Sequence, residues 1–258
     1  MPIKASERKV FIKAEYKAPN VMKAAPVAPQ LNSKEMELLK YILEMRYLSL
    51  AQVIRRFYDN GTVEATIQRM FDLKYLYCKD KELSDSSLLL VTQKGRDVLV
   101  SQYKEIQAPA VTRSPMPGRL NHDMLLNDLR IRFEELNFLK RWVSEMCMKE
   151  MPFFLRAFAD LPDALCKKNN GMAYFLELEV GKKHSKFYRD RIDTYLKVLQ
   201  MKDTKEAKIE GVIFFCYYEE VAEMIKAQVP KDAKGVSVLT YQRYFPAKKD
   251  EKQTEYVH

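Results

Sequence analysis

The sequence predicts an α+β protein with a small, mainly helical unit at residues 31–105 and a larger α/β domain with a mixed sheet at residues 119–245. In the first unit, three helical patterns precede two short strand patterns. Residues 106–118 contain three prolines and show no periodicity, which predicts a linker. In the larger domain, apolar strand patterns alternate with amphipathic helices, as in an α/β sandwich.

Positive charge is concentrated near the start of the chain. The formal net charge is +9, and residues 1–30 carry six Lys or Arg against two Glu. We therefore expect a flexible basic arm at 1–30, and a frayed tail at 246–258. Such charge favours a polyanionic partner, although a solvated arm without a specific role explains it equally well.

Several functional classes lack their sequence signals. The four cysteines show no CxxC spacing, which argues against zinc and disulfides and fits a reducing cytoplasm. No apolar run is long enough to cross a membrane, and no secretory signal is visible. Glycine-rich nucleotide-binding loops are also missing from the sequence. We expect a cytoplasmic protein with no membrane partner.

The order of elements in the first unit is that of a winged helix. Strands are expected at Tyr75–Cys78 and Ser87–Val91, and Thr92 caps a fourth helix. The segment Leu89–Leu99 resembles the end of many winged-helix DNA-binding domains. Three helices are expected before the strands, and each has its own cap: Asn32 with Glu35 for a helix to about Arg46, Ser49 for Leu50–Tyr58, and Thr62 for Val63 to about Lys74.

A winged helix places its third helix in the DNA major groove. The outward side chains there that can contact bases are Thr62, Thr66, Gln68 and Arg69. On the wing, Lys79 and Lys81 are suited to phosphate contacts. Because this unit is nearly neutral, a role in protein contacts or dimerisation is the alternative to DNA binding.

The larger domain begins with a helix that carries His122 on its apolar stripe, and a hairpin is expected at Asn169–Gly171. The remaining expected elements are strands at Trp142–Met148, from Asp163, at Ala173–Val180, Ile209–Tyr218 and Val236–Tyr241, and helices at Arg119–Asn137, His184–Met201 and Glu219–Gln228.

Two carboxylates alternate along one of these strands. Glu177 and Glu179 share a strand face with Phe175, and the hairpin can bring Asp163 close to them. Three such carboxylates can hold Mg²⁺ or Mn²⁺ and position water against a phosphodiester. The equally weighted alternative is a half-exposed hairpin with solvated carboxylates.

These residues resemble the site of the PD-(D/E)xK, or restriction-endonuclease-like, nucleases. The pair Pro162-Asp163 matches the motif, and Glu177-Leu178-Glu179 matches its second half. With the winged helix in front, the chain is similar to plasmid replication-relaxation proteins, including MobC-type mobilisation relaxases. The resemblance also covers His122 and the basic-residue–tyrosine spacing of Arg191 and Tyr195.

The resemblance implies a sequence-specific DNA-binding protein that uses Mg²⁺ or Mn²⁺ to nick or process origin DNA. Its partners would be double-stranded DNA, mobilisation or replication proteins and a second copy in a homodimer. The candidate catalytic set is Asp163, Glu177, Glu179, Arg191, Tyr195 and His122, and the first three are the candidate metal ligands.

One position departs from the motif, because Glu179 stands where the nucleases have lysine. Arg191 is the expected replacement, since its fixed charge suits phosphate. Tyr195 is expected to pack, to bind phosphate or to attack DNA. The departure also leaves a second function open: a catalytically inactive DNA-binding regulator or accessory factor that uses the nuclease-like domain as a scaffold.

Overall fold

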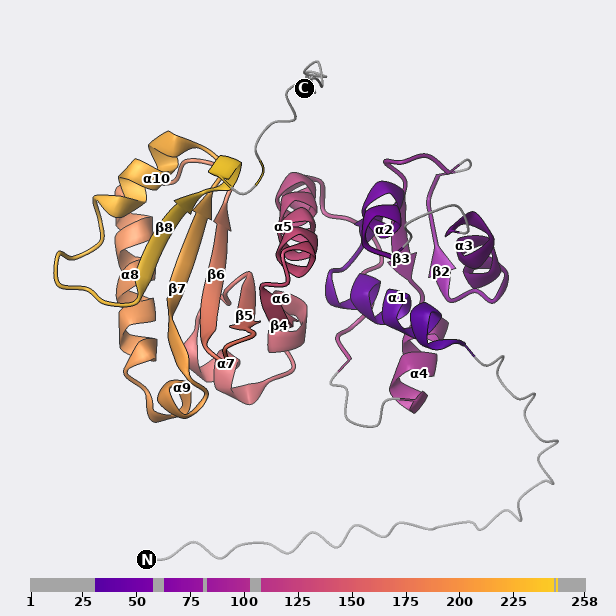
Figure 1. The fold of residues 1–258 in the computed structure, drawn as a ribbon, viewed down its shortest axis with the longest axis horizontal. Helices are drawn as coiled ribbons and strands as arrows, with labels where there is room; N and C mark the ends of the chain where they lie inside the picture. Colours follow the sequence, from indigo (N-terminus) through magenta and orange to yellow (C-terminus); the bar gives the residue numbers. More distant parts are fainter. Residues whose placement is uncertain (1–30, 58–62, 81–82, 103–107, 244, 246–258) are drawn as a thin grey trace, which may run out of the picture. The chain divides into compact units, whose positions relative to one another are not determined.

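The computed structural model shows a mixed α+β chain (Figure 1). It describes residues 31–57, 63–80, 83–102, 108–243 and 245, and residues 33–258 belong to one unit. The expected arm at 1–30 and tail at 246–258 lie outside the described residues. No helix within the described ranges is both long and apolar enough to cross a membrane.

The first part of this unit follows the predicted order of elements, with one extra strand, β1. The central strand β3 pairs antiparallel with β1 on one side and β2 on the other, so that the sheet has three strands. The elements are α1 (Ser33–Glu44), β1 (Leu48–Ser49), α2 (Leu50–Phe57), α3 (Val63–Asp72), β2 (Leu76–Tyr77), β3 (Leu88–Val91) and α4 (Gln93–Gln102).

Two of the predicted helix caps are confirmed. The backbone N–H of Gln52 donates to Oγ of Ser49 at 3.1 Å, and the Gln52 side chain accepts from the Ser49 N–H at 3.2 Å. At the start of α4, the Gly95 N–H donates to Oγ1 of Thr92 at 3.1 Å. These bonds satisfy backbone donors that would otherwise be unpaired at the helix starts.

The predicted linker is held against the first part. Arg96 on α4 donates to the backbone carbonyls of Pro109 at 2.9 Å and Ala108 at 3.0 Å. Lys79, which follows β2, donates to Oγ of Ser114 at 2.8 Å. The described part of the linker is therefore an ordered connection.

The larger domain contains a five-stranded mixed sheet in the order β4-β5-β6-β7-β8. Strands β4, β5 and β6 are antiparallel neighbours, whereas β6, β7 and β8 are parallel. Its strands are β4 (Leu139–Ser144), β5 (Ala164–Lys168), β6 (Ala173–Glu179), β7 (Ile209–Cys216) and β8 (Val236–Thr240). Its helices are α5 (Pro117–Glu135), α6 (Glu145–Met148), α7 (Pro152–Ala157), α8 (Ser185–Leu199), α9 (Lys202–Glu206), α10 (Glu219–Lys226) and the short 3₁₀ turn η1 (Tyr241–Arg243).

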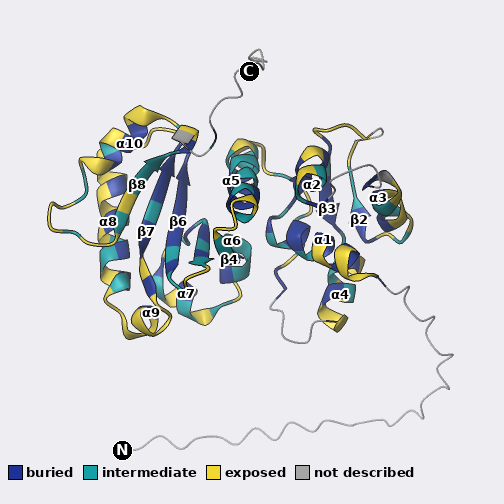
Figure 2. Cartoon of the chain, viewed as in Figure 1, coloured by how far each residue is buried: buried dark blue, intermediate teal, exposed yellow. Residues whose placement is uncertain are grey.

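Helices cover both faces of this sheet (Figure 1). On β7, Phe214 contacts the ring of Tyr195 on α8, and the next residue, Phe215, contacts Phe133 on α5. Because successive strand residues point to opposite faces, α5 and α8 lie on opposite sides. Figure 2 shows that β6 and β7 are the most buried strands, as expected at the centre of a covered sheet.

The strand predicted at Trp142–Met148 is wrong in its second half. Strand β4 ends at Ser144, whose Oγ accepts from the Cys147 N–H and caps helix α6. The apolar residues of α6 could not be distinguished from a strand by their sequence pattern alone. Helices α7 and α9 were not predicted, since both are short.

Buried polar contacts join helix α5 to the first part. Tyr47 donates its hydroxyl to Oδ2 of Asp123 at 2.9 Å, and the side chain of Asn127 donates to the Tyr47 carbonyl at 2.8 Å. Gln52 donates to the Met124 carbonyl at 2.9 Å. Helix α5 therefore contacts both the sheet of the larger domain and helix α2.

Candidate functional site

Asp163 directly precedes β5 and lies next to the carboxylate-bearing part of β6. Ala164, the first residue of β5, is paired with Leu176 on β6. Because the two strands are antiparallel, Asp163 lies alongside Glu177. Oδ2 of Asp163 accepts a hydrogen bond from the Leu178 N–H at 2.8 Å and lies 3.1 Å from Nε2 of His122 on α5. These contacts fix the orientation of the carboxylate.

Glu177 is buried and contacts two residues of α8. Its Oε1 accepts from Nε of Arg191 at 2.7 Å, from a second nitrogen of the same guanidinium, and from the Tyr195 hydroxyl. Arg191 also donates to the backbone carbonyls of Leu161, at 2.9 Å, and Asp160. The Arg191 side chain therefore connects β6 to the loop that leads to Asp163.

Glu179 is also buried, with 4% of its surface exposed, and it has a separate partner. Lys183, in the loop after β6, places Nζ 3.1 Å from Oε1 and 3.0 Å from Oε2 of Glu179. A lysine close behind the strand thus forms an ion pair with this glutamate.

Burial and neighbouring charges shift the pKa values of these groups. Burial, followed by the charge of Asp163, raises the pKa of Glu177 to about 8 despite Arg191 and the Tyr195 hydrogen bond. Burial also raises the pKa of Glu179, against the effect of Lys183. For His122, burial alone would lower the pKa, but hydrogen bonds to Asp123 and Asp163 raise it to about 10.

Two carboxylate oxygens of this cluster are without a hydrogen bond in the part of the chain that the structure describes. Within the described residues, Oδ1 of Asp163 and Oε2 of Glu177 take part in no hydrogen bond. Mg²⁺ commonly binds one or two carboxylates and keeps several waters. A three-carboxylate site is not found: Glu179 is paired with Lys183, and no group of three or more His, Cys, Asp or Glu that could hold a metal occurs in the described ranges.

The predicted strand face is confirmed, since Phe175 and Glu177 both contact Tyr195 on α8. The alternative of solvated carboxylates is wrong, because Glu177 is 6% and Glu179 4% exposed. Both are buried because α8 covers this face of the sheet.

Tyr195 packs among aromatic rings. Its ring centroid lies 5.4 Å from those of Phe158 and Phe175 and 6.0 Å from that of Phe214, and the residue is fully buried. Burial raises its pKa well above the ordinary tyrosine value. Of the three expected roles for Tyr195, this environment favours packing and positioning of Glu177 over attack on DNA.

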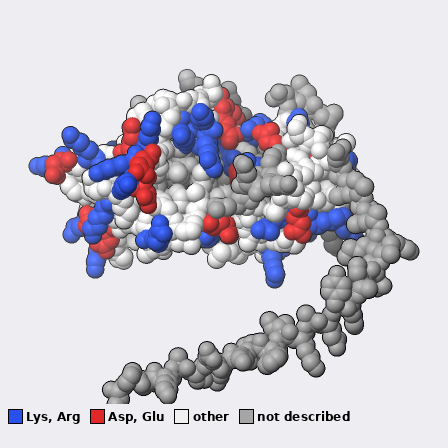
Figure 3. Space-filling model, turned by 90° about the horizontal axis from the view of Figure 1, so that it is seen from below, with Lys and Arg blue, Asp and Glu red and all other residues white. Residues whose placement is uncertain are grey.

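The predicted DNA-contacting residues are only partly available. Gln68 is exposed on α3 and donates to Oδ1 of Asp72 at 2.9 Å, whereas Arg69 is ion-paired with buried Glu35. Thr66 is half-buried, and Lys79 is exposed. Thr62 and Lys81 lie outside the described residues. On the face in Figure 3, basic and acidic side chains are interspersed, with no broad surface of one sign.

Sequence reasoning missed two groups that complete the site. The backbone carbonyls of Asp160 and Leu161 hold Arg191, and no side-chain pattern reveals them. Asp123 lies 3.3 Å from Nδ1 of His122 and supports it from the other side. The sequence shows that Asp123 is adjacent to His122. Its hydrogen bond with Tyr47, which is 76 residues away, cannot be seen from the sequence.

The chain matches no protein-family model, and no curated protein shows significant similarity to it.

Proposed function

We propose that the chain is a DNA-binding protein with a metal-dependent nuclease-like domain, which nicks or processes origin DNA in plasmid mobilisation or replication. Its first part, with the element order of a winged helix, would hold duplex DNA. The larger domain, in which Asp163, Glu177 and Glu179 resemble the PD-(D/E)xK motif, would act on one strand.

One observation carries this proposal: residues far apart in the sequence meet at one place. His122 from α5 contacts Asp163 before β5, and Arg191 and Tyr195 from α8 contact Glu177 on β6. The two sets are adjacent, because the N–H of Leu178, next to Glu177, donates to Asp163. Clusters of buried, charged groups with shifted pKa values are typical of functional sites. The two unbonded carboxylate oxygens supply the acidic ligands that such a site requires.

Asp163 and Glu177 would hold Mg²⁺ or Mn²⁺, which activates water and neutralises phosphate charge when it is bound. His122 orients the Asp163 carboxylate through Oδ2, which leaves Oδ1 free. Arg191 orients Glu177 through Oε1 and is itself fixed by two backbone carbonyls. Because arginine stays protonated, Arg191 contributes positive charge and positioning and does not accept a proton.

A nicking assay tests this function. The substrate is a supercoiled plasmid that carries the DNA around the protein's own gene. We expect Mg²⁺- or Mn²⁺-dependent conversion to nicked circles, lost on chelation and in Asp163→Asn and Glu177→Gln. Glu206→Gln is the matched control, since Glu206 lies on the solvent side of α9 and is exposed. Cleavage that survives both site substitutions would rule out this site.

A second function, a catalytically inactive DNA-binding regulator or accessory factor, is favoured by a different observation. The motif lysine is replaced by Glu179, and both buried glutamates are already neutralised by Lys183 and Arg191. In this case, the same plasmid would be bound without cleavage, independently of metal. The affinity would still fall steeply with salt, because phosphate contacts release counterions.

A further inference from the structure

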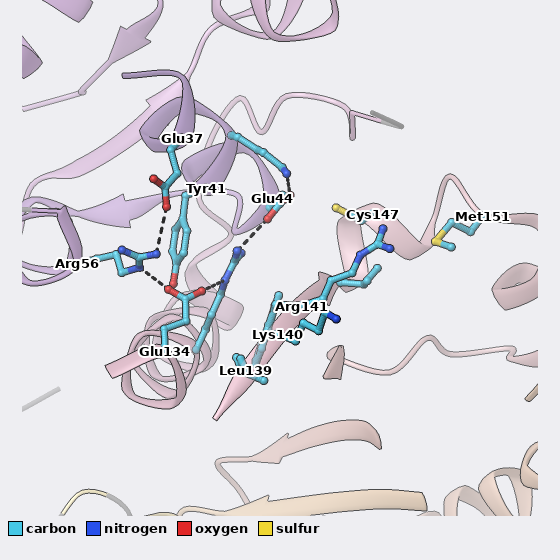
Figure 4. Close-up of a pocket in the computed structure, with 14 residues that line it drawn as sticks. Glu37, Tyr41, Glu44, Arg56, Glu134, Leu139, Lys140, Arg141, Cys147 and Met151 are labelled. Atoms are coloured by element: carbon cyan, nitrogen blue, oxygen red, sulfur yellow. Dashed lines mark hydrogen bonds and ion pairs between the residues drawn. The ribbon is translucent and has the colours of Figure 1, made fainter. Parts of the chain in front are cut away.

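A cavity of about 540 Å³ lies away from the carboxylate site, between helices α1, α2 and α5 and the edge strand β4 (Figure 4). Its volume is within the range of small-molecule binding pockets. Part of its wall is apolar, from Leu139, Val143 and Met151. The remainder is polar and charged.

Three buried side-chain groups that line the cavity have no hydrogen-bond partner within the described residues: the Tyr41 hydroxyl and two N–H donors. Nη1 of Arg130 and Nε1 of Trp142 are buried and form no hydrogen bond within the described residues. The two residues are only 7% and 6% exposed, respectively. A buried donor without a partner costs about 1–3 kcal/mol, so an acceptor in the cavity would be stabilising.

The cavity's own carboxylates do not supply that acceptor. Glu134 accepts from Arg56 and, at 3.1 Å, from Nε of Arg130. Glu44 lies 3.0 Å from Nη2 of Arg130, and Glu37 lies 3.2 Å from Nη2 of Arg56. Figure 4 shows these pairs along one side of the cavity. The three carboxylates are therefore already neutralised.

The cavity-lining charges outside these ion pairs are positive. Lys140 and Arg141, on the exposed part of β4, also line the cavity and form no ion pair within the described part of the chain. A β-bulge between Leu139 and Arg141 interrupts the pairing of β4 with β5 there. Bulges at sheet edges commonly change the direction of a side chain. The cavity groups without a partner within the described residues are thus two buried N–H donors, the buried Tyr41 hydroxyl and two exposed cations.

We propose that this cavity binds a small organic anion of mononucleotide size, whose phosphate or carboxylate oxygens accept from Arg130 and Trp142 and face Lys140 and Arg141. A free inorganic anion would leave the apolar wall uncovered, so the organic part of the ligand would contact Leu139, Val143 and Met151. Because α1 and β4 both line the cavity, the bound ligand would stabilise the contact between them.

The test uses the full chain and 5′-AMP as the probe. Trp142 is the only tryptophan, so its fluorescence reports on this cavity alone. We expect a saturable change in fluorescence, and heat of binding by calorimetry, with 5′-AMP. Adenosine, which lacks the phosphate, should bind at least about tenfold more weakly, since one lost charge contact is worth about 1.4 kcal/mol or more.

Variants locate the binding. Lys140→Gln combined with Arg141→Gln should weaken 5′-AMP binding at least about tenfold. The matched control is Lys202→Gln combined with Lys205→Gln on α9, which should bind like the wild type. Trp142→Phe, read by calorimetry, should also weaken binding, because the ring is kept while the donor is lost.

Three outcomes would overturn the proposal. The first is no heat and no fluorescence change at millimolar 5′-AMP. The second is equal binding of adenosine, which would remove the role of the anion. The third is a response only to duplex DNA that depends on Lys140 and Arg141, which would make the cavity edge part of a DNA surface. Weaker binding of inorganic phosphate that depends on the same residues would support the anion site.

Discussion

Nε of Arg191 donates to Oε1 of Glu177 at 2.7 Å, and the same guanidinium reaches the carbonyl of Leu161 at 2.9 Å. A single side chain on α8 therefore fixes both a buried carboxylate on β6 and the loop before Asp163. This contact makes Arg191 the residue on which the geometry of the carboxylate site depends most directly.

Removal of Arg191 should destabilise the fold through the charge it leaves behind. In Arg191→Met, Glu177 stays buried without its cation, and we expect a loss of about 3 kcal/mol or more in urea unfolding at about pH 9, above the wild-type Glu177 pKa of about 8. Adding Glu177→Gln should restore more than about half of that loss, since no unpaired charge remains. Arg189→Met is the control, because Arg189 is exposed and, among the described residues, its guanidinium donates only to the half-buried Gln228 side chain. A double variant that loses the sum of both single effects would contradict this account.

A backbone contact makes Gly95 on α4 intolerant of a side chain. An added Cβ would lie 2.4 Å from the carbonyl oxygen of Tyr75, a main-chain atom that cannot move cheaply. Gly95→Ala should therefore destabilise the protein by about 1–3 kcal/mol. Gly118→Ala on α5, where nothing lies within 4 Å of the added Cβ, should be neutral or stabilising by about 0.5–1 kcal/mol. Thermal unfolding compares the two, and equal effects would contradict the steric argument.

Local signals account for the parts of the fold that the sequence could predict. The Ser49 and Thr92 caps and the hairpin at Asn169–Gly171 depend on neighbouring residues, and all three are found. Gly171 has the positive φ of +88° that such a turn requires. Strand β1 was missed because its two residues are a strand only through pairing with β3.

Only part of the carboxylate site could be predicted from the sequence, because Glu179 pairs with Lys183 outside it and Asp123 was missed. Alternation placed Glu177 and Glu179 on one face, and helical spacing placed Arg191 and Tyr195 together. Their pairing could not be predicted, since it depends on which cation reaches which carboxylate in space. Lys183 reaches Glu179, whereas Arg191 reaches Glu177.

The contacts of Glu145 predict a dependence of stability on pH. Burial alone would raise its pKa, but the Lys149 hydrogen bond and the charges of Arg46 and Arg119 lower the pKa from 4.5 to about 2. Because the folded pKa lies below the unfolded one, the stabilisation is complete above about 4.5 and is lost as the pH falls towards about 2. The shift corresponds to about 3 kcal/mol at neutral pH.

Glu145→Gln should accordingly be less stable than the wild type near pH 7 by up to about 3 kcal/mol, and this difference should shrink below about pH 4.5 and close near pH 2. Urea unfolding at several pH values measures this difference in the free energy of unfolding. Glu150→Gln is the control, since Glu150 is exposed and forms no ion pair within the described residues. A gap that stays constant with pH would show that Glu145 acts through packing and not through charge.

The DNA-binding role predicts different effects for Gln68 and Lys79, which are both exposed on the first part. A side chain that contacts a base changes specificity, whereas a phosphate contact changes salt dependence. Gln68→Ala should weaken binding to a selected duplex about tenfold and leave non-specific binding unchanged. Lys79→Gln should weaken binding to all sequences and reduce the salt slope by about one.

Fluorescence anisotropy with the selected and a scrambled duplex, over a range of salt, separates the two effects. Lys202→Gln on α9 is the control for a lost surface charge, and its salt slope should match the wild type. The short charged loop after β2 contains few other basic residues that could replace Lys79 in a phosphate contact. Lys79→Gln is therefore a more decisive test than Gln68→Ala. If neither substitution changes DNA affinity while the wild type binds in a salt-dependent way, then α3 and the wing are not the DNA surface. The first part would then serve protein contacts, which is the alternative that its near-neutral charge already favours.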